Sequence, residues 1–165
     1  MKSLSIIFAA IWVAATIWFC SMRIQFSQNC SGYLFQAADA NTVELAAERL
    51  GKALEYIESK GWTDGYTSIL WKTEDENIGF WYTNLKASLQ ELVSVKESSQ
   101  MEQTNVLMKL RETLLDSGEK GEHLTIPRGL WKYPYNGLYA VGACVVNILG
   151  ILAVLFLLII LDREY

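Results

Sequence analysis

The sequence predicts an all-α membrane protein in which two transmembrane helices bracket a helical domain outside the cytoplasm. Two uncharged apolar segments lie near the ends of the 165-residue chain, at 4–22 and 138–161. Each is long enough as a helix to cross a hydrocarbon core of roughly 30 Å, which takes about 20 residues. The segment between them, 23–136, shows helical periodicity and helix-start patterns. We therefore expect a domain of about three helices there, with an irregular Pro/Gly connection to the second span.

The first apolar segment could instead be a secretory signal, because Lys2 precedes it at the start of the chain. The apolar run is longer than a typical signal core. No small-x-small cleavage pattern follows Trp18 and Phe19. We therefore expect 4–22 to remain as an anchor, with cleavage as the alternative.

The charges that flank the two spans are nearly balanced. Lys2 and Arg163 lie on one side, and Arg23, Arg128 and Lys132 lie on the other. Long loops cross membranes largely regardless of their charge, and a signal-anchor-like start normally directs the next segment of the chain across the bilayer. We therefore expect a two-pass protein of the cell membrane, as in a bacterial inner membrane, with both termini cytoplasmic and the middle domain periplasmic or extracellular.

The first predicted helix of the middle domain covers 42–60. Asn41 is its expected N-cap, with Glu44 three residues later, and Gly61 is expected to end it. Apolar residues recur at helical spacing and predict a stripe that faces the core. The stripe contains Val43, Ala46, Ala47, Leu50, Leu54 and Ile57.

The second predicted helix opens in the stretch TEDENIGFWY, 73–82, and continues to about Lys96. Thr73 and Glu76 have the spacing of a capping box, and acidic side chains suit the positive end of a helix dipole. This interpretation explains the carboxylates without a ligand. At about 100° per residue, Phe80 points nearly opposite the core face. That face contains Ile78, Trp81, Tyr82, Leu85, Leu89 and Leu92.

The third predicted helix starts at a second capping box, Ser99 with Glu102, and ends near Ser117. Its apolar residues cover more than half of the circumference, which is too wide for a helix packed on one side only. The helix is therefore either central or contributes an outer stripe to an assembly. The next segment, 118–136, is rich in glycine and has two prolines, so it cannot continue as a helix.

The residues that carry chemistry give no catalytic pattern. His123 is the single histidine, and a nucleophile–base pair would have to join it to Cys30, with no motif around either. Carboxylates without a pattern such as HExxH do not predict a metal site, and we expect no enzyme activity, cofactor or metal. A bridge between Cys20 and Cys144 is conceivable, but small buried thiols are the preferred interpretation. Nucleic acid is not an expected partner, because the middle domain is acidic and has no basic stripe.

The remaining candidates are surfaces. Phe80, Leu45 and Tyr56 lie on the backs of predicted helices, and Asn147 carries an amide within the second apolar segment, so these four are the expected interaction residues. We expect an accessory, scaffold or interaction subunit. Its partners would be the lipid bilayer and either a second copy of the chain or a larger membrane protein.

An aromatic turn supports an alternative function. Trp62, Tyr66 and Trp71 surround a turn, where they either cap the helical bundle or form a pocket for an apolar or cationic ligand. The layout of two spans around a helical domain is similar to that of the sensor halves of chemoreceptors and sensor kinases, in arrangement only. The chain departs from the pattern at Pro127 and Pro134, which would not transmit a helix displacement into the second span.

Overall fold

A computed structural model describes residues 2–70, 72–118, 121–142 and 144–145. Within these ranges it describes the side chains of 13–70, 72–116, 121–142 and 144–145. These residues are mainly helical, which confirms the all-α class. The helices are α1 (Lys2–Phe26), α2 (Gly32–Ala38), α3 (Val43–Ser59), α4 (Ile78–Ser94) and α5 (Gln100–Leu114). A π turn covers Ser27–Ser31, 3-10 turns cover Glu74–Glu76 and Leu130–Lys132, and an antiparallel hairpin joins β1 (Leu115–Gly118) to β2 (Gly121–Leu124).

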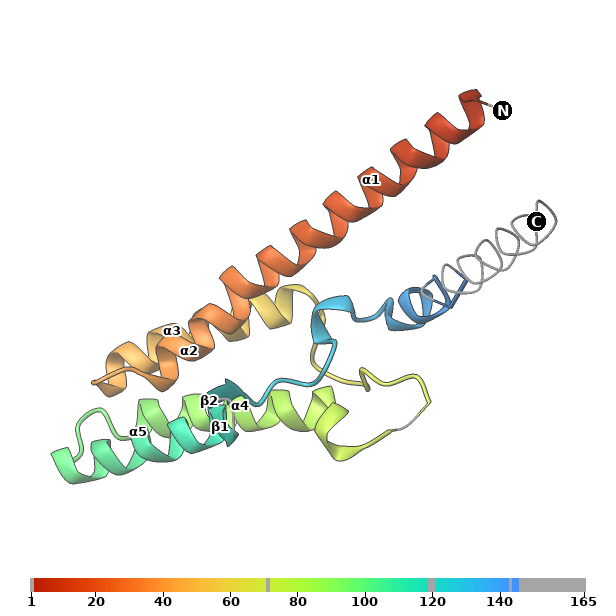
Figure 1. Cartoon of the computed structure of the whole chain (residues 1–165). Coiled ribbons are helices and arrows are strands. Elements are labelled where there is room, and N and C mark those ends of the chain that lie inside the picture. Colours follow the sequence, from red (N-terminus) through yellow and green to blue (C-terminus); the bar gives the residue numbers. More distant parts are fainter. Residues whose placement is uncertain (1, 71, 119–120, 143, 146–165) are drawn as a thin grey trace.

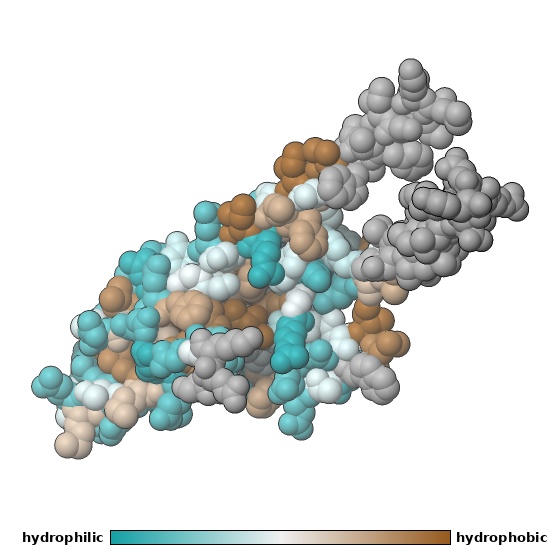
Figure 2. All heavy atoms as spheres, in the orientation of Figure 1, coloured by the Kyte–Doolittle hydropathy of each residue, from teal (hydrophilic) through white to brown (hydrophobic). Residues whose placement is uncertain are grey.

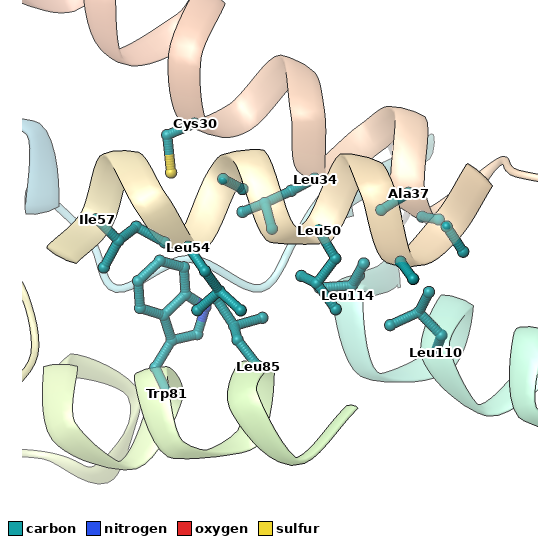
Figure 3. Close-up of a cluster of buried hydrophobic side chains, with 14 of the residues drawn as sticks. Cys30, Leu34, Ala37, Leu50, Leu54, Ile57, Trp81, Leu85, Leu110 and Leu114 are labelled. Carbon is teal, nitrogen blue, oxygen red and sulfur yellow. The ribbon is translucent and has the colours of Figure 1, made fainter. Parts of the chain in front are cut away.

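The core lies around α3. The α1–α2 rod packs on one side of α3, and the α4–α5 hairpin packs on the other (Figure 1). Figure 3 shows Cys30, Leu34 and Ala37 pointing from the rod towards α3, with Trp81 and Leu85 rising from α4 to meet it. The predicted stripe of α3 is confirmed, since all six of its residues are buried. Arg111 of α5 adds a surface link, because it pairs with Asp39 after α2 and with Glu122 of β2.

The rod is continuous from α1 to α2. It stays helical through the π turn at Ser27–Ser31. Gly32 keeps helical dihedral angles, and its N–H donates to the Ser27 carbonyl. A Cβ atom at position 32 would lie only 2.9 Å from that carbonyl oxygen, so glycine permits the wide turn.

The ends of α3 differ from prediction at one residue. Thr42, and not Asn41, is the N-cap, because its side chain accepts a hydrogen bond from the Leu45 amide at 3.3 Å. The predicted end at Gly61 is confirmed. Gly61 has a φ of 69°, and the amide of Trp62 donates back to the Ile57 carbonyl at 3.0 Å, which is the pattern of a glycine-terminated helix.

The start of α4 corrects the predicted capping box at Thr73. The acidic residues form the 3-10 turn instead, and α4 begins after Asn77, whose side chain accepts from the Phe80 amide at 3.0 Å. The cause is a tertiary contact. Asn77 forms a β-bridge with Tyr66 and keeps an extended backbone. The helix therefore starts four residues later than predicted.

The capping box of α5 at Ser99 and Glu102 is confirmed. The helix ends at Leu114, because the chain then enters β1. Leu110 and Leu114 are buried, whereas Met101 and Met108 are exposed by 76% and 58%. Helix α5 is therefore not central, and an outer stripe for an assembly stays a prediction.

The described residues also correct the predicted location. The first apolar segment, 4–22, lies within α1, and 146–161 of the second lies outside the described residues. Within the described part of the chain, no helix combines the length and the apolar character needed to cross a membrane. This finding contradicts a two-pass membrane protein with cytoplasmic termini and a periplasmic or extracellular middle. Towards its end, α1 instead carries Arg23 and Gln25 and buries Phe26 in the core of the module.

Candidate functional site

The predicted interaction residues do not form one surface. Phe80 is 63% exposed on α4, as predicted, and Leu45 is 39% exposed near the start of α3. The first half of α4 lies beside the end of α3, where the Tyr82 hydroxyl donates to Glu58 at 2.5 Å. Phe80 and Leu45 are therefore at opposite ends of the α3–α4 pair. Asn147 lies outside the described residues.

Tyr56 belongs to an aromatic cluster and is half-buried. The Tyr56 ring meets the Trp62 ring edge-on, with 5.7 Å between centroids. The Lys60 ammonium lies 5.4 Å from the centroid of the Tyr56 ring. Burial, and secondarily the nearby Cys30 thiol, raises the pKa of Tyr56. The prediction of an exposed back-face residue is corrected here, because the Tyr56 ring packs on Trp62 of the turn after α3 and against the core.

The structure describes two residues of the predicted aromatic pocket, Trp62 and Tyr66. Trp62 is only 4% exposed, packs 5.7 Å from Phe26, and donates its indole N–H to the Tyr133 carbonyl at 3.2 Å. Tyr66 faces the start of α4, where its hydroxyl accepts from the Asn77 amide at 3.3 Å. Trp71 lies outside the described residues. Trp62 therefore packs against the core, whereas Tyr66 contacts Asn77 just before α4.

A hollow of about 240 Å³ lies beside the first turn of α4, and we call it the acidic hollow. It combines the 3-10 turn, α4, the end of α5 and the chain after β2. The Thr125 hydroxyl donates to the Thr113 carbonyl at 2.7 Å and holds the last two segments together. The lining residues are Glu74, Asp75, Asn77, Phe80, Trp81, Asn84, Thr113, Thr125 and Pro127.

The acidic hollow has uncompensated negative charge. Glu74 and Asp75 are exposed, and among the described residues neither carboxylate has an ion pair or a hydrogen bond. Because Asn77 caps α4, helix capping does not explain them. Two carboxylates beside an exposed phenyl ring attract a cation, since the ring face also carries negative potential. The prediction identified Phe80 but missed the acidic residues as its neighbours in the site.

The residues considered for catalysis lie in unlike surroundings. Cys30 is fully buried between the rod and α3, and loss of hydration raises the pKa of its thiol to about 12. His123 is exposed on β2, with Nδ1 3.0 Å from the Gly121 carbonyl oxygen. Cys30 therefore stays a protonated thiol at neutral pH and cannot supply a thiolate. Cys20 and Cys144 are free and exposed, so the bridge between them is not formed.

Burial of the Cys30 thiol makes the fold less stable at alkaline pH. Its pKa is 9.0 when hydrated and about 12 when folded, so the folded chain holds this proton more tightly. The stabilisation is complete below about pH 9 and is lost as the pH rises towards 12. From about pH 8 to about pH 10, we expect unfolding in urea to become easier by about 1.4 kcal/mol more in the wild type than in Cys30→Ala. Equal pH dependence in the two proteins would contradict this assignment.

We compared the chain with family models, curated proteins and solved structures, and none of them matches it.

Proposed function

We propose that the chain is a non-enzymatic accessory or scaffold subunit whose acidic hollow receives a basic side chain from a protein partner. The observation that carries the proposal is the pair of uncompensated carboxylates, Glu74 and Asp75, beside the exposed ring of Phe80. The site lies on a rigid frame, because α4 is capped by Asn77 and the chain after β2 is bonded to α5. The partner is either a second copy of this chain or another protein.

The physical chemistry favours arginine over lysine at this site. A guanidinium can stack on an aromatic face while it donates hydrogen bonds to carboxylates, whereas an ammonium is more strongly hydrated. A cation at an exposed ring contributes about 0.5–1 kcal/mol, and an exposed ion pair about 0.2–1 kcal/mol. The acidic hollow therefore anchors one side chain within a larger interface.

Peptides with arginine, lysine, norleucine or glutamate at one central position test the proposal. We expect the full chain to bind them in that order of affinity, as measured by fluorescence polarisation. Changing Glu74→Gln and Asp75→Asn together should weaken the arginine peptide by roughly three- to tenfold, because two charge pairs are lost. The norleucine peptide should change little.

Two control variants complete this test. Glu97→Gln removes an exposed carboxylate beyond the end of α4, and Phe35→Ala removes an exposed ring of α2. Neither should alter binding, whereas Phe80→Ala should weaken both the arginine and the lysine peptides. Preference for norleucine over arginine, or equal binding after the double charge change, would show that the proposal is wrong. Size analysis of the unliganded chain then separates a second copy from a different partner.

A further inference from the structure

A second hollow lies between α1, the end of α3 with the turn after it, and the segment 131–135. We call it the aromatic hollow. Its volume is about 240 Å³. Its nine lining side chains come from three separate parts of the chain, and five of them are aromatic. The lining residues are Met22, Gln25, Tyr56, Lys60, Trp62, Trp131, Tyr133, Pro134 and Tyr135.

A larger groove, which we call the apolar groove, adjoins this hollow. Its volume is about 440 Å³, and Trp18, Tyr135, Leu138 and Tyr139 line it. Tyr135 lines both sites, so the two spaces are neighbours. Trp18 is 54% exposed and Leu138 is 71% exposed. Figure 2 shows apolar atoms gathered where α1 leaves the body of the molecule.

Basic side chains lie at and beside the aromatic hollow. Lys60 lines the aromatic hollow, and Arg23 and Lys132 lie over the Trp131 ring, with the charged groups 5.4 Å and 5.0 Å from its centroid. Within the residues that the structure describes, none of these three cations has an ion pair. Their surroundings differ from those of Lys52, Lys86, Lys109, Arg49 and Arg111, which all pair with carboxylates.

The walls of this site are held in place without a ligand. The Phe19 ring packs edge-on against Trp131 at 4.6 Å and against Tyr139 at 5.5 Å between centroids. The Trp62 indole donates to the Tyr133 carbonyl on the opposite wall. A ligand would therefore bind without first ordering these rings, which lowers the entropic cost of binding.

We propose that the aromatic hollow and the apolar groove together bind an anionic amphiphile. The acidic group lies among Arg23, Lys60 and Lys132, and the apolar body extends past Tyr135 into the groove. Charge complementarity and apolar burial thus act at adjacent ends of one ligand. A carboxylate, phosphate or sulfonate on an alkyl chain has this chemistry, either as a free molecule or as the acidic headgroup of a lipid. This inference is independent of the acidic hollow and concerns different residues.

Calorimetric titration of the full chain with dodecanoate, kept below its micelle concentration, tests the site. We expect saturable one-to-one binding, and no such binding of dodecyltrimethylammonium, which has the same tail with the opposite charge. Octanoate should bind at least several-fold more weakly, because it fills less of the apolar groove. Equal binding of the two dodecyl compounds would overturn the proposal.

Charge variants locate the acidic group. Arg23→Gln and Lys132→Gln should each weaken dodecanoate binding by several-fold, and the double variant more strongly. Lys96→Gln is the matched control, since Lys96 is exposed near the end of α4, and binding should be unchanged. Circular dichroism verifies that each variant is folded. Unaltered binding by a folded double variant would overturn the proposal.

Vesicles distinguish the two sources of the ligand. Cosedimentation compares the full chain with vesicles of neutral lipid alone and with vesicles that also contain an acidic phospholipid. Saturable dodecanoate binding without preference between the vesicles supports a free amphiphile. A preference for acidic vesicles that Arg23→Gln and Lys132→Gln abolish supports a lipid headgroup. Equal, variant-independent binding to both vesicles, together with no dodecanoate binding, would overturn the site.

Discussion

Replacing Trp62 with alanine is expected to lower the free energy of unfolding by about 3–5 kcal/mol, because a large buried ring is lost. Trp62 is 4% exposed and joins three parts of the chain: the Phe26 ring on α1, the Tyr56 ring on α3, and the carbonyl of Tyr133. Urea unfolding followed by far-ultraviolet circular dichroism measures the change without relying on tryptophan fluorescence.

Two further variants separate the roles of the Trp62 ring. Trp62→Phe keeps an aromatic ring but leaves the Tyr133 carbonyl without its donor, and should lose about 1–3 kcal/mol. Leu70→Ala is the surface control, since Leu70 is 80% exposed, and should change stability by less than about 0.5 kcal/mol. A loss below about 1 kcal/mol for Trp62→Ala would mean that Trp62 does not hold these segments together.

Replacing Gly65 with alanine is expected to cost about 2–4 kcal/mol. Gly65 has a φ of 97°, which strains any residue with a side chain, and its new Cβ would lie 2.5 Å from the Tyr133 hydroxyl oxygen. The Tyr133 side chain would have to shift away from the new methyl group. Chemical unfolding measures the loss of stability.

The control for Gly65 has matched backbone geometry. Gly121 has a φ of 107°, but a Cβ there meets no atom within 4 Å, so Gly121→Ala should show the backbone strain alone. In a double-mutant cycle, Tyr133→Phe should recover part of the cost at Gly65, because it removes the hydroxyl group. Equal losses at positions 65 and 121 would contradict the steric part of the explanation.

Local patterns predict those parts of the fold that depend on local physics. The core stripe of α3, its end at Gly61 and the capping box of α5 all depend on residues within one or two turns of each other. The start of α4 depends on a contact from outside the helix. Thr73 and Glu76 have the right spacing for a cap, but the bridge between Tyr66 and Asn77 places the helix start at Ile78. Sequence spacing alone could not show this pairing.

The candidate sites show the same division. The exposure of Phe80 is a consequence of the rotation of about 100° per residue within one helix. Its neighbours Thr113 and Thr125 approach because β1 and β2 reverse the chain within a segment whose composition predicts an irregular connection. The Trp131 ring packs on Phe19, and the charged groups of Arg23 and Lys132 lie over it. Such long-range contacts require the tertiary arrangement.

The π turn at Ser27–Ser31 affects which way the whole rod faces. In a regular α-helix, side chains spaced by four residues drift around the axis by about 40° at each step. In a π turn each residue advances the chain by a smaller angle around the helix axis than in an α-helix, which offsets this drift. Met22, Phe26, Cys30 and Leu34, each four residues after the last, can thus stay on one line of the rod. One uninterrupted helical rod therefore supplies both a wall of the aromatic hollow and the upper layer of the core. Removal of one residue from the turn would swing α1 by about 100° and direct Met22 away from that wall.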